Sequence, residues 1–474
     1  MNKTKLTPKS KNISNWYLQL MELAELADYS YAKGTIVFKP YAYAIWEQIQ
    51  KTLDNWFKQD GVENAYFPLF IPYSLLEKEK THVKGFSPEL AIVTIGGGEK
   101  LKEPLVVRPT SETIMYATFS KWLKSYQDLP LKINQWCSVV RWEKRTYPFL
   151  RTSEFLWQEG HTAHLSNDLA KKMVLKALNW YYKLYTDYLA IEPFIGQKSS
   201  AEKFAGADET YAIETPVENG KSIQSATSHN LGQNFSKAFN IQVLNKDNQL
   251  IYVWQTSWGL STRTLGALFL AHGDDKGLIL PPKIAPYQII LLPVTNDNKV
   301  LSLTKKLEQD LSNDFRVRTD LKLKKGLGWR ITNWELKGAP LIIEIGKKES
   351  QSKQLTLKIR NRDNKININQ QNCRQEIAKL LDELQTDLLT AFRKKKQKLL
   401  QKVETKEEFI KAINQKKFAK AYWCESKLCE AKIKDDTKAV SRVVELDNLN
   451  QDDNRTCFYC GKPAKREWII AKSY

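Results

Sequence analysis

The sequence is poor in cysteine, methionine and histidine, and it contains no long apolar run. Among 474 residues there are 6 Cys, 4 Met and 5 His. So few cysteines exclude a disulfide-rich secreted scaffold and favour a reducing compartment. The longest apolar runs, such as residues 289–292, are strand-sized and fall well short of the roughly 20 residues that a membrane-spanning helix needs. The polar N-terminus also lacks the apolar centre of a secretory signal. We therefore expect a cytoplasmic protein that does not span a membrane.

Acidic residues are fewer than basic residues. Lys and Arg together number 73 against 53 for Asp and Glu, which gives a net charge of +20. Such an excess favours a polyanionic partner, nucleic acid before membrane, although ordinary solvated lysines are an alternative explanation. Hydrophobic residues make up 42% of the chain, which excludes a disordered protein. The length predicts two to four domains.

The pattern along the chain changes twice. In residues 1–286, runs of strands with flanking helices predict an antiparallel α+β domain that ends near several prolines. In residues 287–400, strands alternate with helices, which predicts a small α/β domain followed by a connecting helix. That helix ends in a basic run at residues 393–398, which is either a solvated helix end or an RNA contact. Residues 401–474 hold two cysteine pairs and form the third predicted domain.

Three consecutive glycines at residues 96–98 invite comparison with a phosphate-binding loop. A P-loop requires Lys and then Ser or Thr, followed directly by a helix, and none of these features follows the glycines. The triplet instead predicts a hairpin turn between strands at residues 90–95 and 104–108.

Residues 139–161 read VVRWEKRTYPFLRTSEFLWQEGH and carry most of the chemistry. Arg141 and Glu143 are two positions apart on a predicted strand and therefore share one face. Arginines on such a face can bind phosphates through forked hydrogen bonds, and an aromatic ring can stack on a base. An ion-paired Arg–Glu sheet face is the alternative. The residues expected to repeat this parity on the returning strand are Phe155, Trp157, Glu159 and His161.

The cysteines give a separate signal. Cys424 and Cys429 are five positions apart, and Cys457-x2-Cys460 is followed by glycine. Paired thiolates with this spacing are typical of a tetrahedral structural Zn²⁺ site. Cys137 lies outside this cluster, as does Cys373. His161 and His164 are three positions apart on a predicted strand, so they face opposite sides and no metal is expected there.

Three short motifs occur in the order found in class II aminoacyl-tRNA synthetases. Arg141-x-Glu143, a loop, and then Arg151, Phe155 and Glu159 resemble motif 2. Gly61 followed after six residues by Pro-Leu-Phe at 68–70 resembles motif 1, whose proline lies at a homodimer interface in that family. Residues 259–263, GLSTR before an apolar helix, resemble motif 3, with Ser261 where many members have glycine.

Longer strings are similar to the prolyl-tRNA synthetase family, in its archaeal/eukaryotic-like type. They include RPTSET at 108–113, TSHNLGQNF at 227–235, HGDDKGLILPP at 272–282 and WELKGAPLIIEIG at 334–346. The resemblance implies a class II antiparallel-sheet catalytic domain, an α/β anticodon-binding domain and a small α+β zinc-binding C-terminal domain. Members of the bacterial type carry an editing insertion between motifs 2 and 3. Here only residues 165–257 separate these motifs, so no editing domain is expected.

The resemblance also implies an activity and its site. The enzyme would join L-proline to ATP as prolyl-adenylate with release of pyrophosphate, and then transfer proline to tRNA(Pro) with release of AMP. Arg141 and Arg263 are implied as catalytic residues, with Mg²⁺ sharing the phosphate charge. Glu112 would bind the proline ammonium, although Thr110–Glu112 otherwise reads as an ordinary helix start. The implied ATP-binding residues are Arg141, Glu143, Arg151, Thr152, Phe155, Gln224, Thr227, Ser261 and Arg263. The implied proline-binding residues are Thr110, Glu112, Arg141, Trp157, Glu159, His161, His229 and Ser261.

Two alternatives stay open at this point. One is another class II synthetase, such as the threonine or serine enzyme, but the threonine enzyme would use catalytic zinc ligands and motif 2 has none. The other is a non-catalytic tRNA-binding paralogue, which would be expected to lose arginines that this chain retains at 141, 151 and 263. A small apolar pocket discriminates against a smaller amino acid by only about 1–3 kcal/mol, so mischarging with alanine is predicted. The resemblance further hints that the carboxylate of Tyr474 approaches the active site.

Overall fold

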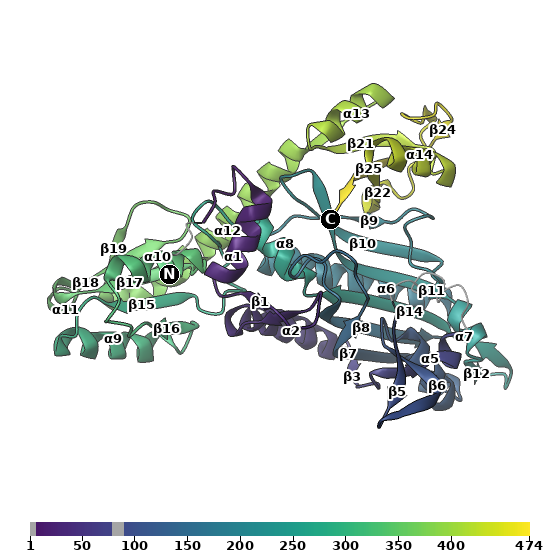
Figure 1. Cartoon of the computed structure of the whole chain (residues 1–474), viewed down its shortest axis with the longest axis horizontal. Coiled ribbons are helices and arrows are strands. Elements are labelled where there is room, and N and C mark those ends of the chain that lie inside the picture. Colours follow the sequence, from purple (N-terminus) through teal and green to yellow (C-terminus); the bar gives the residue numbers. More distant parts are fainter. Residues whose placement is uncertain (1–5, 78–89) are drawn as a thin grey trace.

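The computed structural model describes residues 6–77 and 90–474. The remaining residues, 1–5 and 78–89, belong to the predicted catalytic domain and lie outside the described part of the chain. The centre of the molecule is an 11-stranded sheet in the order β20-β21-β25-β22-β9-β10-β11-β14-β8-β7-β3 (Figure 1). From β9 to β7 every neighbouring pair is antiparallel, which confirms the predicted catalytic sheet. These catalytic strands are β3 (Glu63–Asn64), β7 (Leu131–Val140), β8 (Glu154–His164), β9 (Phe194–Gln197), β10 (Glu209–Pro216), β11 (Lys221–Gly232) and β14 (Trp254–Ser261).

Three helices bury apolar side chains in one large core with this sheet. In α2 (Pro40–Gln59) the residues Ile45, Ile49 and Leu53 are fully buried, and their helical spacing places them on one face. Helices α6 (Asn167–Lys183) and α8 (Arg263–His272) contribute to the same core. Within the described ranges, no helix combines the length and apolarity needed to cross a membrane. The smaller elements of this region are α1 (Ile13–Leu23), β1 (Ala27–Tyr29), β2 (Ile36–Phe38), α5 (Glu112–Trp122), a 3-10 turn (Tyr126–Asp128), a π-helical turn (Leu184–Tyr188), α7 (Asn234–Ala238), β12 (Gln242–Leu244) and β13 (Leu250–Tyr252).

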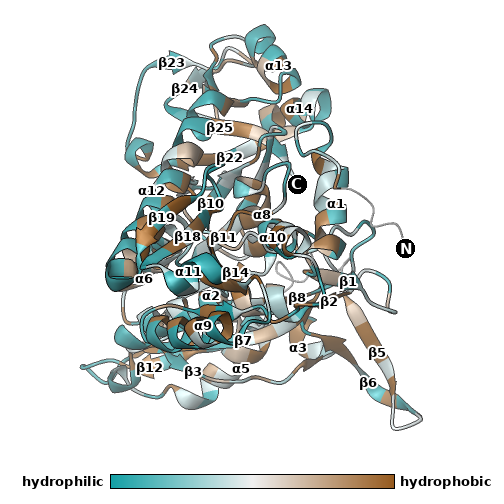
Figure 2. Ribbon diagram, turned by 90° about the vertical axis from the view of Figure 1, so that its left-hand side faces the viewer, coloured by the Kyte–Doolittle hydropathy of each residue, from teal (hydrophilic) through white to brown (hydrophobic). Residues whose placement is uncertain are grey.

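The glycine triplet forms a hairpin turn, as predicted. β5 (Ala91–Gly96) pairs with β6 (Glu99–Val107), and β4 (Phe70–Pro72), which leads into α3 (Tyr73–Glu77), completes a three-stranded sheet. Gly97 and Gly98 occupy the turn with φ of 61° and 85°, values that glycine adopts without steric cost. The second strand begins at Glu99, earlier than the expected residue 104. In Figure 2 the hairpin protrudes from the body, and β5 is largely hydrophobic in colour.

Residues 289–369 form a separate five-stranded sheet in the order β16-β15-β17-β18-β19. The strands β16, β15 and β17 are parallel to one another. Strand β18 is antiparallel to both of its neighbours, β17 and β19. Helices connect the first four strands along the chain. This arrangement confirms the predicted α/β region, although the strand at residues 366–369 was not anticipated. Helix α12 then crosses the molecule toward the C-terminal region (Figure 1). The elements are β15 (Ile289–Pro293), α9 (Asn298–Leu311), β16 (Val317–Thr319), α10 (Leu327–Leu336), β17 (Leu341–Ile345), α11 (Lys347–Gln351), β18 (Gln354–Ile359), β19 (Ile366–Asn369), a 3-10 turn (Gln370–Asn372) and α12 (Cys373–Leu399).

The C-terminal region continues the catalytic sheet. Its strand β22 pairs with β9, where Val444 lies opposite Gln197, and its last strand β25 pairs with the start of β11. Gly196 permits the first of these contacts, because a Cβ there would lie 1.9 Å from the carbonyl oxygen of Val444. The region thus shares backbone hydrogen bonds with the catalytic strands. Its elements are β20 (Leu400–Lys402), α13 (Lys406–Asn414), β21 (Phe418–Trp423), α14 (Lys427–Thr437), β22 (Ala439–Glu445), a 3-10 turn (Leu446–Asn448), β23 (Arg455–Thr456), β24 (Pro463–Ala464) and β25 (Arg466–Ser473).

Candidate active site

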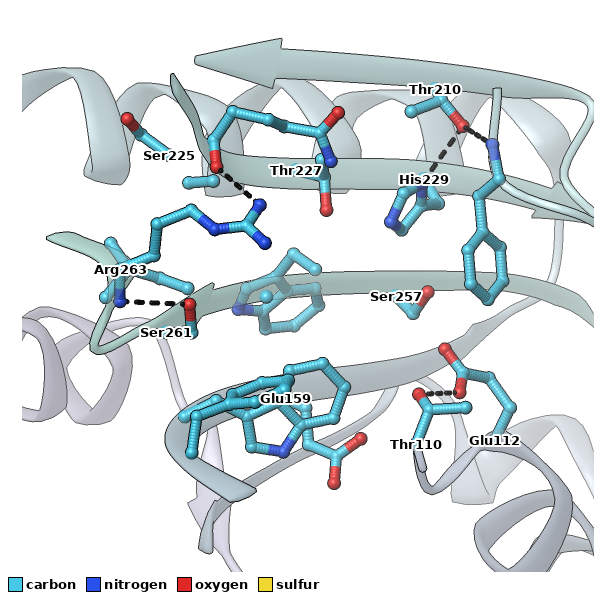
Figure 3. A pocket seen from close by; sticks show the side chains of 18 of the residues that line it. Thr110, Glu112, Glu159, Thr210, Ser225, Thr227, His229, Ser257, Ser261 and Arg263 are labelled. Atoms are coloured by element: carbon cyan, nitrogen blue, oxygen red, sulfur yellow. Dashed lines mark hydrogen bonds between the residues drawn. The ribbon is translucent and has the colours of Figure 1, made fainter. Parts of the chain in front are cut away.

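A cavity of about 180 Å³ lies on the catalytic sheet, against β8, β11 and β14. In Figure 3, Arg263 and Ser261 lie at one end of it, whereas Glu112 and His229 lie at the other. We refer to these as the Arg263 end and the His229 end. A second cavity of about 210 Å³ adjoins the Arg263 end. The residues that line both cavities are Arg141, Phe155, Ser261 and Arg263.

Every residue that the sequence implicated in ATP or proline binding lines at least one of these cavities. The smaller set around the second cavity includes Glu143, Arg151 and Thr152. Residues from α5, β8, β11 and β14 line the first cavity, which brings together segments more than 100 positions apart in the chain. The implicated residues that line the first cavity are Thr110, Glu112, Arg141, Phe155, Trp157, Glu159, His161, Gln224, Thr227, His229, Ser261 and Arg263.

The predicted strand location of Arg141 and Glu143 is wrong. Strand β7 ends at Val140, and both residues follow it in irregular backbone, where only the 2.8 Å bond from the Arg141 amide to the Ser153 carbonyl extends the ladder. The side chain of Arg141 contacts both the loop before α5 and strand β8. Its Nε donates to the carbonyl of Pro109 at 3.0 Å, and its guanidinium lies 5.5 Å from the centre of the Phe155 ring.

Three guanidinium groups converge on the second cavity. Arg263, the first residue of α8, donates from Nε to the Leu150 carbonyl at 2.9 Å. Arg151 binds Glu143 at 2.7 Å, and Arg141 completes the set. Burial and the neighbouring charge of Arg141 lower the pKa of Arg263 to about 10, so this group is still a cation at neutral pH. The result is a concentrated positive charge in a confined space, which suits a polyphosphate.

At the His229 end, the loop before α5 is tied to β8 through Glu159. The backbone amide of Ser111 donates to Glu159 Oε2 at 3.1 Å, and the Ser111 hydroxyl donates to Oε1. Gln135 Nε2 donates to Oε1 as well, at 3.0 Å. Glu159 is only 2% exposed, and its carboxylate holds this loop through the hydrogen bonds from Ser111. The neighbouring Glu112 accepts a hydrogen bond from Thr110 and is also buried.

His161 connects Glu159 to the core. Its Nε2 lies 3.1 Å from Glu159 Oε2, and its Nδ1 lies 3.0 Å from the hydroxyl of Tyr116. Burial opposes protonation of the ring, but the hydrogen bond to Glu159 and the charge of Glu112 outweigh it, so the pKa of His161 is raised. Burial opposes ionisation of Glu159, but its contact with His161 and the hydrogen bonds from Ser111 and Gln135 lower its pKa. The imidazole of His161 and the carboxylates of Glu112 and Glu159 therefore form one buried cluster.

Several cavity residues were not anticipated from the sequence, among them Glu202, Phe204, Thr210 and Ser257. Phe204 lies over His229 with ring centres 4.6 Å apart, and Thr210 Oγ1 lies 3.0 Å from His229 Nδ1. Ser257 is 2% exposed, and its hydroxyl has no hydrogen-bond partner in the described structure. Because Ser257 is four positions before Ser261 on β14, counting by twos along the strand would have placed it on the cavity face. The chain offers no comparable signal for Phe204 or for Glu202, which lie in a loop.

The four C-terminal cysteines meet in space. Cys424 Sγ lies 3.5 Å from Cys460 Sγ, and Cys429 Sγ lies 3.9 Å from Cys457 Sγ. All four sulfurs lie within 4.8 Å of one another. Four thiolates at the usual zinc–sulfur distance of about 2.3 Å would be separated by about 3.8 Å in a tetrahedron, so the donor set fits a zinc ion. Cys137 and Cys373 lie outside this cluster, as expected.

The sheet, the arginine-lined cavity and the comparisons with known proteins define a class II aminoacyl-tRNA synthetase. The family model “tRNA synthetase class II core domain (G, H, P, S and T)” matches residues 94–272. “Anticodon binding domain” matches residues 288–386, and “Prolyl-tRNA synthetase, C-terminal” matches residues 406–474. The chain belongs to the prolyl-tRNA synthetases, which attach proline to tRNA(Pro).

Similar proteins support this membership over the full length. The chain is 47% identical over 471 residues to a proline–tRNA ligase of Ruminiclostridium cellulolyticum, covering 99% of this chain and 98% of that protein. It is 44% identical over 475 residues to that of Natranaerobius thermophilus, with the same coverage. A crystal structure of prolyl-tRNA synthetase from Cryptosporidium parvum, complexed with halofuginone and AMPPNP, matches with a TM-score of 0.95, 40% identity and 100% of each chain covered.

Proposed function

We propose that the cavity binds the two small substrates end to end, with ATP phosphates at the Arg263 end and proline at the His229 end. The observation that carries this assignment is the convergence of Arg141, Arg151 and Arg263 on one cavity. Three cations there match a triphosphate, and the carboxylate of Glu112 at the opposite end matches an ammonium.

Formation of prolyl-adenylate follows from this placement without a protein nucleophile. The proline carboxylate attacks the α-phosphorus of ATP, and pyrophosphate leaves. Arg141 lines both cavities, so it is placed to hold the α-phosphate beside the attacking carboxylate. Arg151 and Arg263 hold the β and γ phosphates, a charge that Mg²⁺ shares when bound. Rate enhancement then comes from alignment and from stabilisation of phosphoryl charge.

The His229 end offers a wall and polar groups for proline. We assign the ammonium to Glu112 and the ring to the space beside Phe204, His229 and Trp157. The unpartnered hydroxyl of Ser257 provides a further polar contact in this space. The polar atoms of Glu159 and His161 bind protein groups, so both serve this end chiefly by holding the loop that carries Glu112. In the second reaction step, a terminal ribose hydroxyl of tRNA attacks the prolyl carbonyl of the adenylate, and AMP leaves.

The C-terminal cysteines would hold structural Zn²⁺. Cys424, Cys429, Cys457 and Cys460 provide the tetrahedral donor set described above. We take residues 1–286 as the catalytic domain, 287–400 as the anticodon-binding domain with its connecting helix and 401–474 as the zinc-binding domain. Retention of all four cysteines supports the archaeal/eukaryotic-like type. Residues 165–257 are used by α6, β9 to β13 and α7, which supports the absence of a cis editing domain, and we expect the enzyme in the cytoplasm.

We further propose a homodimer formed around motif 1. Near Pro68, the side chains of Tyr66 and Phe70 are 73% and 46% exposed. In the adjoining hairpin, Ile92 and Ile95 are 50% and 63% exposed, and Figure 2 shows the hydrophobic strand β5 standing away from the body. Clustered exposed apolar side chains are typical of a protein interface.

Pyrophosphate exchange with each of the twenty amino acids tests the proposed site. We expect exchange with proline, and weak exchange with alanine at millimolar concentration. Exchange with threonine or serine in place of proline would contradict the assignment of the His229 end. Exchange that persists at the wild-type rate in an Arg263→Ala variant would contradict the assignment of the Arg263 end.

A further inference from the structure

The turn that carries Phe204 into the cavity is held by the C-terminal region. This turn, at residues 199–204, directly follows β9 and contributes Glu202 and Phe204 to the cavity lining. In the sheet, β9 lies between β10 of the catalytic region and β22 of the C-terminal region. The strand leading into the turn is therefore fixed from both sides, and its far neighbour belongs to a segment more than 200 positions away in the chain.

Glu430, in the first turn of α14, reaches across to this turn. Its side chain is buried, and its Oε2 accepts a hydrogen bond from the Ser199 hydroxyl at 3.1 Å. Its Oε1 accepts from the backbone amide of Ser441 at 3.2 Å and from the Ser441 hydroxyl. In the described part of the chain no Lys, Arg or His forms an ion pair with Glu430. Its charge is stabilised by these donors and by the N-terminal end of the helix dipole.

Ser199 passes this restraint to the turn. Its hydroxyl oxygen accepts from the Glu202 amide at 3.3 Å, and its carbonyl accepts from the Lys203 amide at 2.9 Å. The next residue, Phe204, donates its amide to Thr210 Oγ1 at 3.0 Å and lies over His229. A continuous series of contacts thus runs from the C-terminal region to the ring that walls the His229 end.

We propose that Glu430 is a positioning residue for proline recognition, acting through Ser199 on the placement of Phe204 against His229. The proposal rests on the assignment of the His229 end to proline. Glu430 does not line the cavity, so it acts only through the turn. The ATP-binding residues stand on other strands and loops, and the effect should therefore be confined to proline.

Steady-state pyrophosphate exchange with full-length Ser199→Ala and Glu430→Ala variants tests this. Each variant removes the hydrogen bond between Ser199 and Glu430, which is worth about one order of magnitude or less in an equilibrium constant, so we expect the KM for proline to rise about fivefold to tenfold. The KM for ATP should stay within about twofold of wild type. Because both residues belong to one series of contacts, the KM for proline of the double variant should rise no further than that of the more impaired single variant. Glu430→Gln, which keeps the size and one acceptor oxygen, should give a smaller rise.

Asp436→Ala is the matched control. Asp436 is a carboxylate on the same helix, but it contacts Lys406 and Tyr459 within the C-terminal region. Its loss should leave the KM for proline unchanged. Zinc content is measured for every variant because Glu430 follows Cys429, whereas Ser199→Ala leaves the cysteine segments untouched.

The outcomes separate the inference from the proposed site. An unchanged KM for proline in Ser199→Ala and Glu430→Ala, additive effects in the double variant, or an equal rise in Asp436→Ala would each overturn the positioning role. Glu112→Gln reports on the site itself. If Glu112→Gln raises the KM for proline and the Ser199 and Glu430 variants do not, only the positioning role fails. If Glu112→Gln has no effect, the assignment of the His229 end to proline fails.

Discussion

The guanidinium of Arg263 donates a 2.9 Å hydrogen bond to the carbonyl oxygen of Leu150. This bond joins the first turn of α8 to the loop between β7 and β8, two segments that are 113 positions apart. Arg263 Nη1 donates to the Gln224 carbonyl at 3.3 Å, and the side chain lines the cavity with Arg141 and Ser261. Arg263 therefore both shapes the proposed phosphate site and contributes charge to it.

The Arg263→Lys variant tests whether the positive charge alone is enough or whether the shape of the guanidinium is also needed. Lysine keeps the cation but lacks the planar fork that can hold the Leu150 carbonyl and a phosphate together. We expect kcat/KM for ATP in pyrophosphate exchange to fall about 100-fold to 1000-fold, as for loss of a preorganised donor to transition-state charge. Thermal stability measured in parallel should change little. Activity within a few fold of wild type would contradict the phosphate role.

Glu112→Gln should weaken proline binding with little effect on ATP. The buried carboxylate is the proposed partner of the proline ammonium, and hydrogen bonds to charged groups contribute about 1.5–3 kcal/mol. The expected rise in the KM for proline is therefore on the order of 10-fold to 100-fold. Thr113→Ser, at the next position and also buried, is a conservative control. An equal rise in the KM for ATP would point to a general collapse of the loop.

Removal of zinc should destabilise the C-terminal region. Cys429 and Cys457 are buried beside α14 and the strands that extend the catalytic sheet, so loss of the ion leaves four close thiols without their common partner. We expect about one zinc per chain by metal analysis, and a lower melting temperature after chelation or in Cys457→Ser. Cys373→Ser, outside the cluster, should keep its zinc. Purified protein with no zinc and unchanged stability on chelation would contradict the site.

In the buried ion cluster between the two parts of the central sheet, loss of the anion should destabilise the protein more than loss of one cation. Glu214 binds both Arg442 at 2.7 Å and Lys198 at 3.1 Å, and all three side chains are nearly inaccessible to solvent. Glu214→Gln leaves two buried cations unpaired, so it should cost about 3–5 kcal/mol in the free energy of unfolding. Arg442→Met leaves the pair between Glu214 and Lys198 and should cost less. Denaturant unfolding of both variants measures this order, and a reversed order would contradict it.

His272 should make the protein sensitive to mild acid. Burial lowers its pKa from 6.5 to about 3, although a hydrogen bond to the Leu189 carbonyl opposes this. The unfolded chain takes up a proton below 6.5 and the native chain does not, so stability is lost as the pH falls through 6.5. At pH 5 the loss is about 2 kcal/mol. Between pH 7 and pH 5, the free energy of unfolding of His272→Gln should fall by about 2 kcal/mol less than that of the wild type. An equal fall in both proteins would contradict this role of His272.

The motifs and most elements could be read from the chain because they depend on local spacing. The glycine triplet predicted the turn between β5 and β6. The paired cysteines predicted a four-sulfur cluster. The predicted strand location of Arg141 was wrong, because the end of β7 at Val140 depends on where its pairing contacts with β8 stop. Local spacing contains no information about such contacts.

The sequence by itself determined the family, the order of the three regions and the residue types available for phosphate, proline and zinc. Only the tertiary structure decided that the C-terminal strands extend the catalytic sheet and that Glu430 meets Ser199 beside the cavity. The physical reason is that spacing along a helix or strand fixes which side chains share a face. Which faces meet depends on sheet order and on packing between segments hundreds of residues apart, where a single glycine such as Gly196 permits the approach.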